Sequence, residues 1–258
     1  MARVLALSSH VARGHVGLAA TVPALQRLGH EVWALPTVVL ASRPGLGTLE
    51  RQELPDLAAM LAALERDGGW AMLDAVIAGY FPGEAAVGVA AGAIARIKVA
   101  NPLVKVLVDP ILGDAGRLYV AQATAEAIRD LLLPLADIVT PNRFELEWLA
   151  GAATTGLDDI ARAARGLGPP TVAVTSAAET QAEVATLLVT QGTAIERRLP
   201  RRDRIPNGAG DLFAGLLLGC LLKGMAEEGA LDAALAALDR VLAASTGRDV
   251  LELAALLG

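Results

Sequence analysis

Residues 207–211 read Asn-Gly-Ala-Gly-Asp and are followed directly by an apolar run that predicts a buried helix. The glycines allow a tight turn that leaves backbone amides bare. Bare amides at a helix N-terminus bind anions, because the helix dipole adds to the unsatisfied donors. Asp211 is therefore either an N-cap of the helix or a catalytic base. As a base, it would lie beside a nest formed by the amides of Gly208, Ala209 and Gly210 that holds a phosphoryl group during transfer.

A second candidate carboxylate ends an apolar run, since Asp109 follows Val108 and precedes Pro110. An aspartate before a proline often starts a turn. At the carboxyl end of a strand it is also suited to meet Mg²⁺ or a metal-bound phosphate, because hard cations prefer carboxylate oxygens. The sequence leaves both interpretations of Asp109 open.

Asn142 and Glu145 follow a proline that stops another strand-like run. Their spacing is that of a capping box, in which two side chains bind each other's backbone amides. The same spacing places both side chains on one side of a first helical turn, where they can hold waters of a hydrated Mg²⁺. The capping and metal-binding interpretations thus use one geometry.

The segment at residues 8–17 is polar, contains glycines and carries two of the three histidines. Its serine hydroxyls suit a small polar ligand, and the alternative is a plain solvent-exposed loop. The spacing of His10 and His15 is not that of a helical zinc pair, so we do not expect zinc here.

Short β-rich runs alternate along the chain with longer Ala/Leu-rich stretches. This alternation predicts a parallel sheet that is covered by helices on both faces and that positions the candidate residues. The expected strands are residues 4–7, 31–35, 75–78, 104–108, 138–140 and 171–174. The expected helices are residues 18–28, 54–65, 84–99, 123–133, 143–149, 157–166, 209–223 and 228–245, with a hairpin of 184–189 and 194–199 before the last two. Ligands of such sheets bind beyond the carboxyl ends of the strands, where the candidate residues lie.

The chain has 258 residues, 54% of them hydrophobic, which suits one α/β domain over residues 1–258. Its net charge of −6 and the lack of a basic block argue against nucleic acid and anionic membranes as partners. No G-x-x-x-x-G-K-S/T motif and no G-x-G-x-x-G after the first strand is present, which excludes P-loop and dinucleotide-binding proteins. Cys220 is alone, so no internal disulfide is expected. No signal peptide is visible, and we expect a cytoplasmic location.

Several short motifs occur in a fixed order over essentially the whole chain. They are Ser9-His10-Val11, Gly14-His15-Val16-Gly17, Thr37-Val38, Gly79-Tyr80, Asp109-Pro110, Leu118-Tyr119-Val120, residues 140–145 and residues 208–211. Together they resemble the ribokinase-like superfamily and, within it, the pyridoxal kinase branch. The resemblance implies an α/β fold, a three-layer α/β/α sandwich with a mostly parallel central sheet.

The resemblance also implies ATP-dependent phosphorylation of the 5′-hydroxymethyl group of pyridoxal, and it extends to pyridoxine and pyridoxamine. Asp211 is then the base that takes the proton of the 5′-hydroxyl, and the amides of residues 208–210 form the anion hole for the γ-phosphoryl group. The residues implied in binding the vitamin are Ser9, His10, Val11, Thr37 and Tyr80.

For the nucleotide, the resemblance implies ATP as co-substrate and Mg²⁺ as cofactor, and it allows K⁺ as a further cofactor. Asp109 and Glu145 would hold Mg²⁺ directly or through water. The residues implied at the ATP site are Asp109, Tyr119, Asn142, Glu145, Thr175, Ser176, Gly208 and Gly210. The resemblance further implies a homodimer.

The role of one segment and the exact function stay open. The Arg-rich residues 197–204 would either clamp nucleotide phosphates or form a solvated loop. Hydroxymethylpyrimidine kinase, or another small-molecule kinase of the same fold, is the enzymatic alternative. A non-catalytic vitamin-binding protein is the alternative from another class, although Asp211 argues against it, since binding alone needs no base there.

Overall fold

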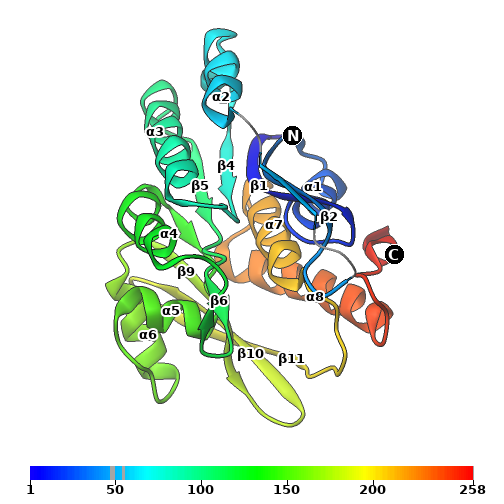
Figure 1. Ribbon diagram of the computed structural model, residues 1–258. Coiled ribbons are helices and arrows are strands. Elements are labelled where there is room, and N and C mark those ends of the chain that lie inside the picture. Colours follow the sequence, from blue (N-terminus) through cyan, green and yellow to red (C-terminus); the bar gives the residue numbers. More distant parts are fainter. Residues whose placement is uncertain (47–49, 54–55, 258) are drawn as a thin grey trace.

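A sheet forms the middle layer of the molecule, as the computed structural model shows over residues 1–46, 50–53 and 56–257 (Figure 1). Within these residues its nine strands are, in spatial order, β11 (Ala194–Pro200), β10 (Glu183–Thr190), β9 (Thr171–Glu179), β8 (Ile138–Val139), β5 (Lys105–Val108), β4 (Ala75–Ala78), β1 (Arg3–Arg13), β2 (Glu31–Ser42) and β3 (Arg51–Glu53). The strands from β9 to β2 pair in parallel, whereas β3 at one edge and the β10–β11 hairpin at the other pair antiparallel.

Helices cover both faces of the sheet (Figure 1). One face packs against α1 (Leu18–Arg27), α7 (Ala209–Leu222), α8 (Glu227–Ser245) and the 3-10 turn η4 (Leu253–Leu257). The other packs against α2 (Leu57–Arg66), the 3-10 turn η1 (Gly69–Met72), α3 (Glu84–Ala100), α4 (Gln122–Ala127), α5 (Arg143–Ala150) and α6 (Leu157–Gly166). A small hairpin of β6 (Gly113–Asp114) and β7 (Arg117–Leu118) follows β5.

The first half of β1 shows why the central strands are apolar throughout. Val4 and Ala6 belong to the core formed with α1, α7 and α8, whereas Leu5 and Leu7 belong to the core on the opposite face. Successive side chains of a strand point to opposite faces, so a strand covered on both sides needs an apolar residue at each position. The predicted three-layer α/β/α sandwich with a mostly parallel sheet is confirmed.

The strands β1 and β2 extend well beyond their predicted ends. Because β4 ends at Ala78, β1 pairs from there on with β2 alone, and the short β3, which was not predicted, pairs with β2. The register of β1 and β2 shifts after Ser8, which leaves Thr37 as an extra residue in β2. We call residues 9–13 and 37–42 the arm, since they continue past the carboxyl edge of the neighbouring strands.

Most predicted helices agree with the structure to within one residue at each end, and two differ. The helix predicted at residues 54–65 is α2, which begins after an N-cap at Asp56, while residues 54–55 lie outside the described residues. The helix predicted at 123–133 is divided into α4, a π turn η2 (Ile128–Leu132) and a 3-10 turn η3 (Leu133–Leu135). Pro134 explains why no regular helix continues here, because proline cannot donate a helical hydrogen bond. Among the described residues, no helix is long and apolar enough to cross a membrane.

Two helical glycines make opposite contributions to stability. In α7, a Cβ atom on Gly215 would lie 3.0 Å from the carbonyl oxygen of Thr21 and 3.1 Å from Ala24 Cβ, so the glycine lets α7 pack closely on α1. In α3, Gly88 is exposed, and a Cβ atom there would have no neighbour within 4 Å.

We predict that Gly88→Ala raises the free energy of unfolding by about 0.5–1 kcal/mol, because alanine loses less backbone entropy in a helix. Gly215→Val should lower it by about 1–3 kcal/mol through overpacking. Urea denaturation followed by circular dichroism measures both. If Gly215→Val were as well tolerated as Gly88→Ala, the close α1–α7 contact would be wrong.

Candidate active site

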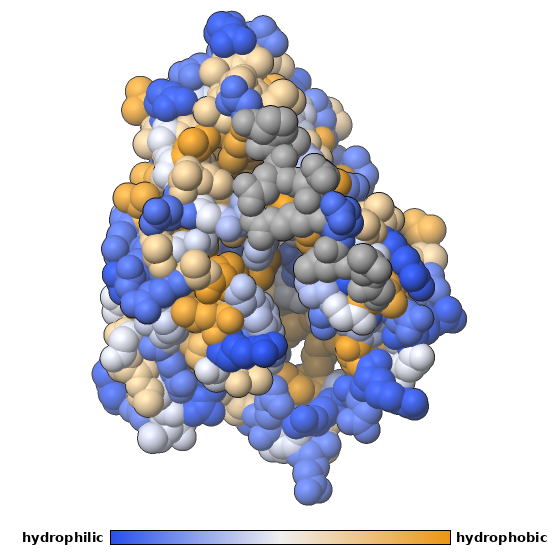
Figure 2. Space-filling view, viewed as in Figure 1, coloured by the Kyte–Doolittle hydropathy of each residue, from blue (hydrophilic) through white to orange (hydrophobic). Residues whose placement is uncertain are grey.

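The candidate site lies at the carboxyl edge of the parallel strands. Ser8 of β1, Gly79 after β4, Asp109 after β5 and Asp211 of α7 all line one small cavity of about 10 Å³. In the space-filling view the molecule is hollowed near the centre of this face, between the side that carries β6 and the side that carries the C-terminus (Figure 2). The fold thus brings together Ser8 and Asp211, which are 203 positions apart in sequence.

Asp211 does not cap α7. The N-cap is Gly208, which has a positive φ of 111° and no side chain to cap with, and Asp211 lies in the first helical turn. Burial of its carboxyl group raises the pKa of Asp211 to about 6, and this outweighs the hydrogen bonds from the amides of Gly17 and of Asp211 itself, which lower it. A carboxyl group with a pKa near 6 is well matched to proton transfer near neutral pH.

Asp109 is buried and receives a 2.9 Å hydrogen bond from the hydroxyl of Thr140 on its Oδ1 atom. Burial raises the pKa of Asp109 well above its ordinary value, and the charges of Asp211 and Glu145 raise it further, whereas the bond from Thr140 lowers it. The three carboxyl groups therefore share one electrostatic environment. Positive charge or a ligand proton at this point would relieve their repulsion.

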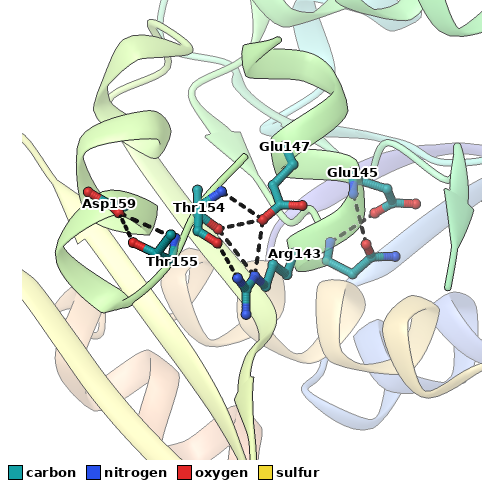
Figure 3. Close-up of polar contacts among 7 residues, drawn as sticks. Arg143, Glu145, Glu147, Thr154, Thr155 and Asp159 are labelled. Atoms are coloured by element: carbon teal, nitrogen blue, oxygen red, sulfur yellow. Dashed lines mark hydrogen bonds and ion pairs between the residues drawn. The ribbon is translucent and has the colours of Figure 1, made fainter. Parts of the chain in front are cut away.

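Glu145 and Asn142 form the predicted capping box at the start of α5 (Figure 3). Glu145 also accepts hydrogen bonds at Oε1 from the amides of Leu112, at 2.9 Å, and Gly113, at 3.3 Å. The Asn142 side chain donates to the carbonyl oxygen of Gly113 at 2.8 Å. The two side chains thus hold the β6–β7 hairpin, and burial still raises the pKa of Glu145 to about 7 despite the amides. Arg143 is turned away, toward Glu147 and Thr154 (Figure 3).

The described residues fit Mg²⁺ only if a substrate supplies further ligands. Among them, no group of three or more His, Cys, Asp or Glu side chains could hold a metal ion alone. Mg²⁺ commonly uses one or two carboxylates together with phosphate oxygens and waters. Asp109 suits this role through its Oδ2 atom, for which the described residues give no hydrogen-bond partner, and Glu145 suits it through water, because both of its oxygens already accept amides.

Three of the residues expected at the vitamin are close to one another. The hydroxyl of Thr37 donates to the carbonyl oxygen of Tyr80 at 2.7 Å, and the amide of Tyr80 donates to Ser8 Oγ at 3.0 Å. Ser9 is buried against Gly17, where a Cβ atom would collide with it. The base of the arm is therefore joined to the loop after β4.

The other two residues expected at the vitamin, Val11 and His10, lie in different surroundings. Val11 is buried in a small apolar cluster with Val38 and Leu40, against which Tyr80 packs. His10 is exposed and lies between the buried Ser9 and Val11 in β1, so it points to the other face of the arm. The structure thus associates Val11 with Tyr80 and leaves His10 apart.

The residues expected at ATP lie around the start of α5. Thr175 pairs with Asn142 through a bridge in which its amide donates to the carbonyl oxygen of Pro141 at 2.9 Å. Ser176 follows with a positive φ of 47°. Tyr119 is 56% exposed, and its amide donates to the carbonyl oxygen of Leu112 at 2.6 Å, which places it beside the segment that Glu145 holds.

The Arg-rich residues 197–204 belong to β11 as far as Pro200 and form an irregular, largely exposed segment from residue 201 on. Arg197 forms ion pairs of 2.6 Å with both Glu228 and Asp232, and Arg202 forms one of 2.6 Å with Asp239, all on α8. These arginines join β11 and the segment after it to α8. The positive charges of Arg197 and Arg202 are therefore paired with carboxylates of α8.

Sequence reasoning missed several residues that support the site. Ser8 holds the Tyr80 amide, Thr140 holds Asp109, and the Thr21 hydroxyl donates to the carbonyl oxygen of Asp211 at 3.1 Å. Ser8 and Thr140 directly follow or end strand-like runs, which was an available signal. Thr21 is inside a helix and had no such signal, because its partner is 190 positions away.

A wider cavity of about 1090 Å³ opens elsewhere. It includes Asp137 and Pro170, which directly precede β8 and β9, so it lies at the amino-terminal edge of the sheet. It shares no lining residue with the candidate site.

Comparison with known proteins agrees with this fold. A profile of the family described as phosphomethylpyrimidine kinase matches residues 71–250. The chain is 38% identical to "Pyridoxal kinase PdxY" of Corynebacterium diphtheriae over 89% of this chain and 83% of that protein. It is also 38% identical to "Pyridoxine/pyridoxal/pyridoxamine kinase" of Bordetella avium over 97% of this chain and 88% of that protein.

Among solved structures, the pyridoxal kinase from Leishmania donovani in complex with ADP and pyridoxamine is similar to this chain with a TM-score of 0.91 and 26% identity, over 98% of this chain and 94% of that one. The fold and the matched profile define a small-molecule kinase of the α/β/α class. The chain belongs to the phosphomethylpyrimidine kinase family, and the two relatives described above are named as kinases of pyridoxal and of pyridoxine, pyridoxal and pyridoxamine.

We predict that Asp211→Asn raises the free energy of unfolding at pH 8 and raises it less at pH 5. The folded-state pKa of about 6 exceeds the ordinary value of 3.8, so the charged carboxylate destabilises the fold. This cost grows as the pH rises from 3.8 to about 6, is complete above that range, and is absent in the uncharged variant. Urea denaturation at both pH values measures the difference, and an equal effect at both would contradict the raised pKa.

Proposed function

We propose that this protein is an ATP-dependent pyridoxal kinase that transfers the γ-phosphoryl group of ATP to the 5′-hydroxyl of pyridoxal. The observation that carries the proposal is the Asp211 carboxyl group, whose pKa is raised to about 6, directly after the Gly208–Gly210 amides at the N-terminus of α7. The pyridoxal kinase relatives support the substrate class. The name of the Bordetella avium relative supports pyridoxine and pyridoxamine as further substrates.

In this mechanism Asp211 accepts the proton of the 5′-hydroxyl as that oxygen attacks the γ-phosphorus and the bond to ADP breaks. The amides of Gly208, Ala209 and Gly210 stabilise the charge on the transferring group, since they need no reorganisation to do so. Phosphoryl transfer requires positioning and charge stabilisation more than covalent catalysis. A base and an anion nest on one helical turn supply both.

The remaining expected residues divide between the two substrates. Ser9, Thr37 and Tyr80, with Val11, are proposed to bind the pyridine ring and its substituents at the base of the arm. The side chains proposed to line the nucleotide site are Asp109, Tyr119, Asn142, Glu145, Thr175 and Ser176.

Bound Mg²⁺ would neutralise charge on the phosphates, and Asp109, with Glu145 through water, is proposed to hold it. The buried carboxyl group of Asp109, whose pKa the charges of Asp211 and Glu145 raise further, supports a cation at this point. K⁺, a homodimer and a cytoplasmic location stay predictions of the sequence analysis.

Coupled measurement of ADP release tests the proposal with pyridoxal, pyridoxine, pyridoxamine, hydroxymethylpyrimidine and ribose as acceptors. We expect the highest kcat/KM with pyridoxal. A preference for hydroxymethylpyrimidine would replace the proposed substrate while keeping the reaction. Binding of pyridoxal without turnover of any acceptor would indicate a vitamin-binding protein instead.

We predict that Asp211→Asn lowers kcat by roughly 10²–10⁴, the usual scale for a positioned base, while both substrates bind within a few-fold. In the unsubstituted protein, kcat/KM should fall as the pH drops below about 6, because protonation removes the base. Steady-state kinetics between pH 5 and pH 9 measures both effects. Near-unchanged turnover in folded Asp211→Asn protein would refute the mechanism.

We predict that Glu145→Gln raises the Mg²⁺ concentration needed for half-maximal rate, because an amide binds Mg²⁺ more weakly than a carboxylate. The variant should also unfold more easily, since an amide nitrogen cannot accept from the amides of Leu112, Gly113 or Asn142. Lower stability with an unchanged Mg²⁺ titration would restrict Glu145 to capping and to holding the β6–β7 hairpin.

A further inference from the structure

The anion nest is supported from behind by two residues that lie far from it in sequence. Gly208 has a φ of 111°, and a Cβ atom on it would collide with the main-chain carbonyl oxygen of His15. The same atom would lie 3.1 Å from Leu251 Cδ1, whose side chain is buried. His15 and Leu251 thus contact Gly208 together, and only glycine fits between them.

A hydrogen bond also joins these two residues to each other. His15 Nδ1 lies 2.7 Å from the carbonyl oxygen of Leu251. A carbonyl oxygen only accepts, so Nδ1 must carry the hydrogen, and the bond forms whether or not Nε2 is protonated. The imidazole ring therefore fixes its own backbone to the C-terminal segment and against Gly208.

The loop that carries His15 needs such an anchor. Gly14 and Gly17 flank it with positive φ values of 112° and 55°, and glycines of this kind give the intervening backbone wide conformational freedom. The same segment reaches the base, because the amide of Gly17 lowers the pKa of the Asp211 carboxyl group and the Thr21 hydroxyl donates a hydrogen bond to the Asp211 carbonyl oxygen. The position of this loop thus affects the nest and the base at once.

We propose that His15 is a positioning residue for phosphoryl transfer: anchored on Leu251, it holds its carbonyl group against Gly208 and so fixes the direction of the nest amides. The role of the nest rests on the proposed function. Displacement of stabilising groups by about 1 Å can cost about 100-fold in rate, whereas most of the residues proposed to bind the two substrates lie outside the nest. Loss of the anchor should therefore lower kcat far more than it changes either KM.

The chain offers a control in the same C-terminal segment. Arg27 donates from Nε to the carbonyl oxygen of Leu256 at 2.8 Å, and Arg43 donates from Nε to that of Asp249 at 3.2 Å. These bonds hold the segment independently of His15. Arg27→Met therefore loosens the same segment without removing a contact to Gly208.

The test compares His15→Asn, His15→Gln, His15→Leu and Arg27→Met in the full chain. Asparagine places an amide donor near the position of Nδ1, whereas glutamine places it near Nε2 and leucine has none. We expect His15→Gln and His15→Leu to lower kcat by about 10–100-fold with KM values within about three-fold. His15→Asn should stay within about three-fold of the original kcat, and Arg27→Met should lower Tm while kcat per folded molecule is kept.

Hydrogen exchange of residues 205–211 gives a second readout that does not depend on turnover. Protection there should fall in His15→Gln and His15→Leu but not in His15→Asn or Arg27→Met. Unchanged kcat in His15→Leu, equal loss in the asparagine and glutamine variants, a change confined to KM, or the same loss in Arg27→Met would each overturn the proposal. If His15→Leu fails to fold, the asparagine and glutamine pair decides. Lack of turnover in the unsubstituted protein would refute the proposed function alone, and exchange would still test the anchor.

Discussion

The repulsion that Asp109 experiences from two neighbouring carboxylates shapes the carboxyl edge of the sheet. Asp109 follows β5, Glu145 belongs to α5 and Asp211 to α7, and the charges of the last two raise the pKa of the first. Backbone amides and the Thr140 hydroxyl stabilise these carboxylates, but the pKa of Asp109 stays raised. A fold that keeps such a cluster loses stability, which is typical of sites built to receive a ligand of opposite charge or a proton.

The surrounding strands and helices bring the three carboxyl groups to one edge of the sheet. Short, fully buried parallel strands bring Asp109 and Thr140 to one edge, and the helix α7, packed tightly on α1 through Gly215, brings Asp211 to meet them. The capping box of α5 has a double use, since Glu145 caps the start of the helix and also holds the β6–β7 hairpin. The two interpretations of the Asn142–Glu145 spacing therefore describe one arrangement, in which capping orients the carboxylate.

Local pattern was sufficient to predict the buried strands and most helices, because their periodicity is strong and does not depend on distant partners. It failed for the arm, since β1 and β2 continue by pairing with each other, and for the turn after α4, where Pro134 interrupts the helix. At the site, the position of Asp211 in the first turn of α7 depends on the left-handed Gly208, so composition alone could not separate a cap from a base. The ion pairs of Arg197 in β11 could not be predicted from local pattern, because its acidic partners on α8 are more than 30 positions away.

The arginines of β11 also affect the edge of the sheet. Within the described residues, β11 is an outermost strand, and an unpaired strand edge can template the addition of a strand from another chain. Glu196, Arg197 and Arg198 place charge along this edge, and Pro200 ends it without an amide hydrogen to donate. The residues that dock α8 thus also protect the protein from edge-to-edge aggregation.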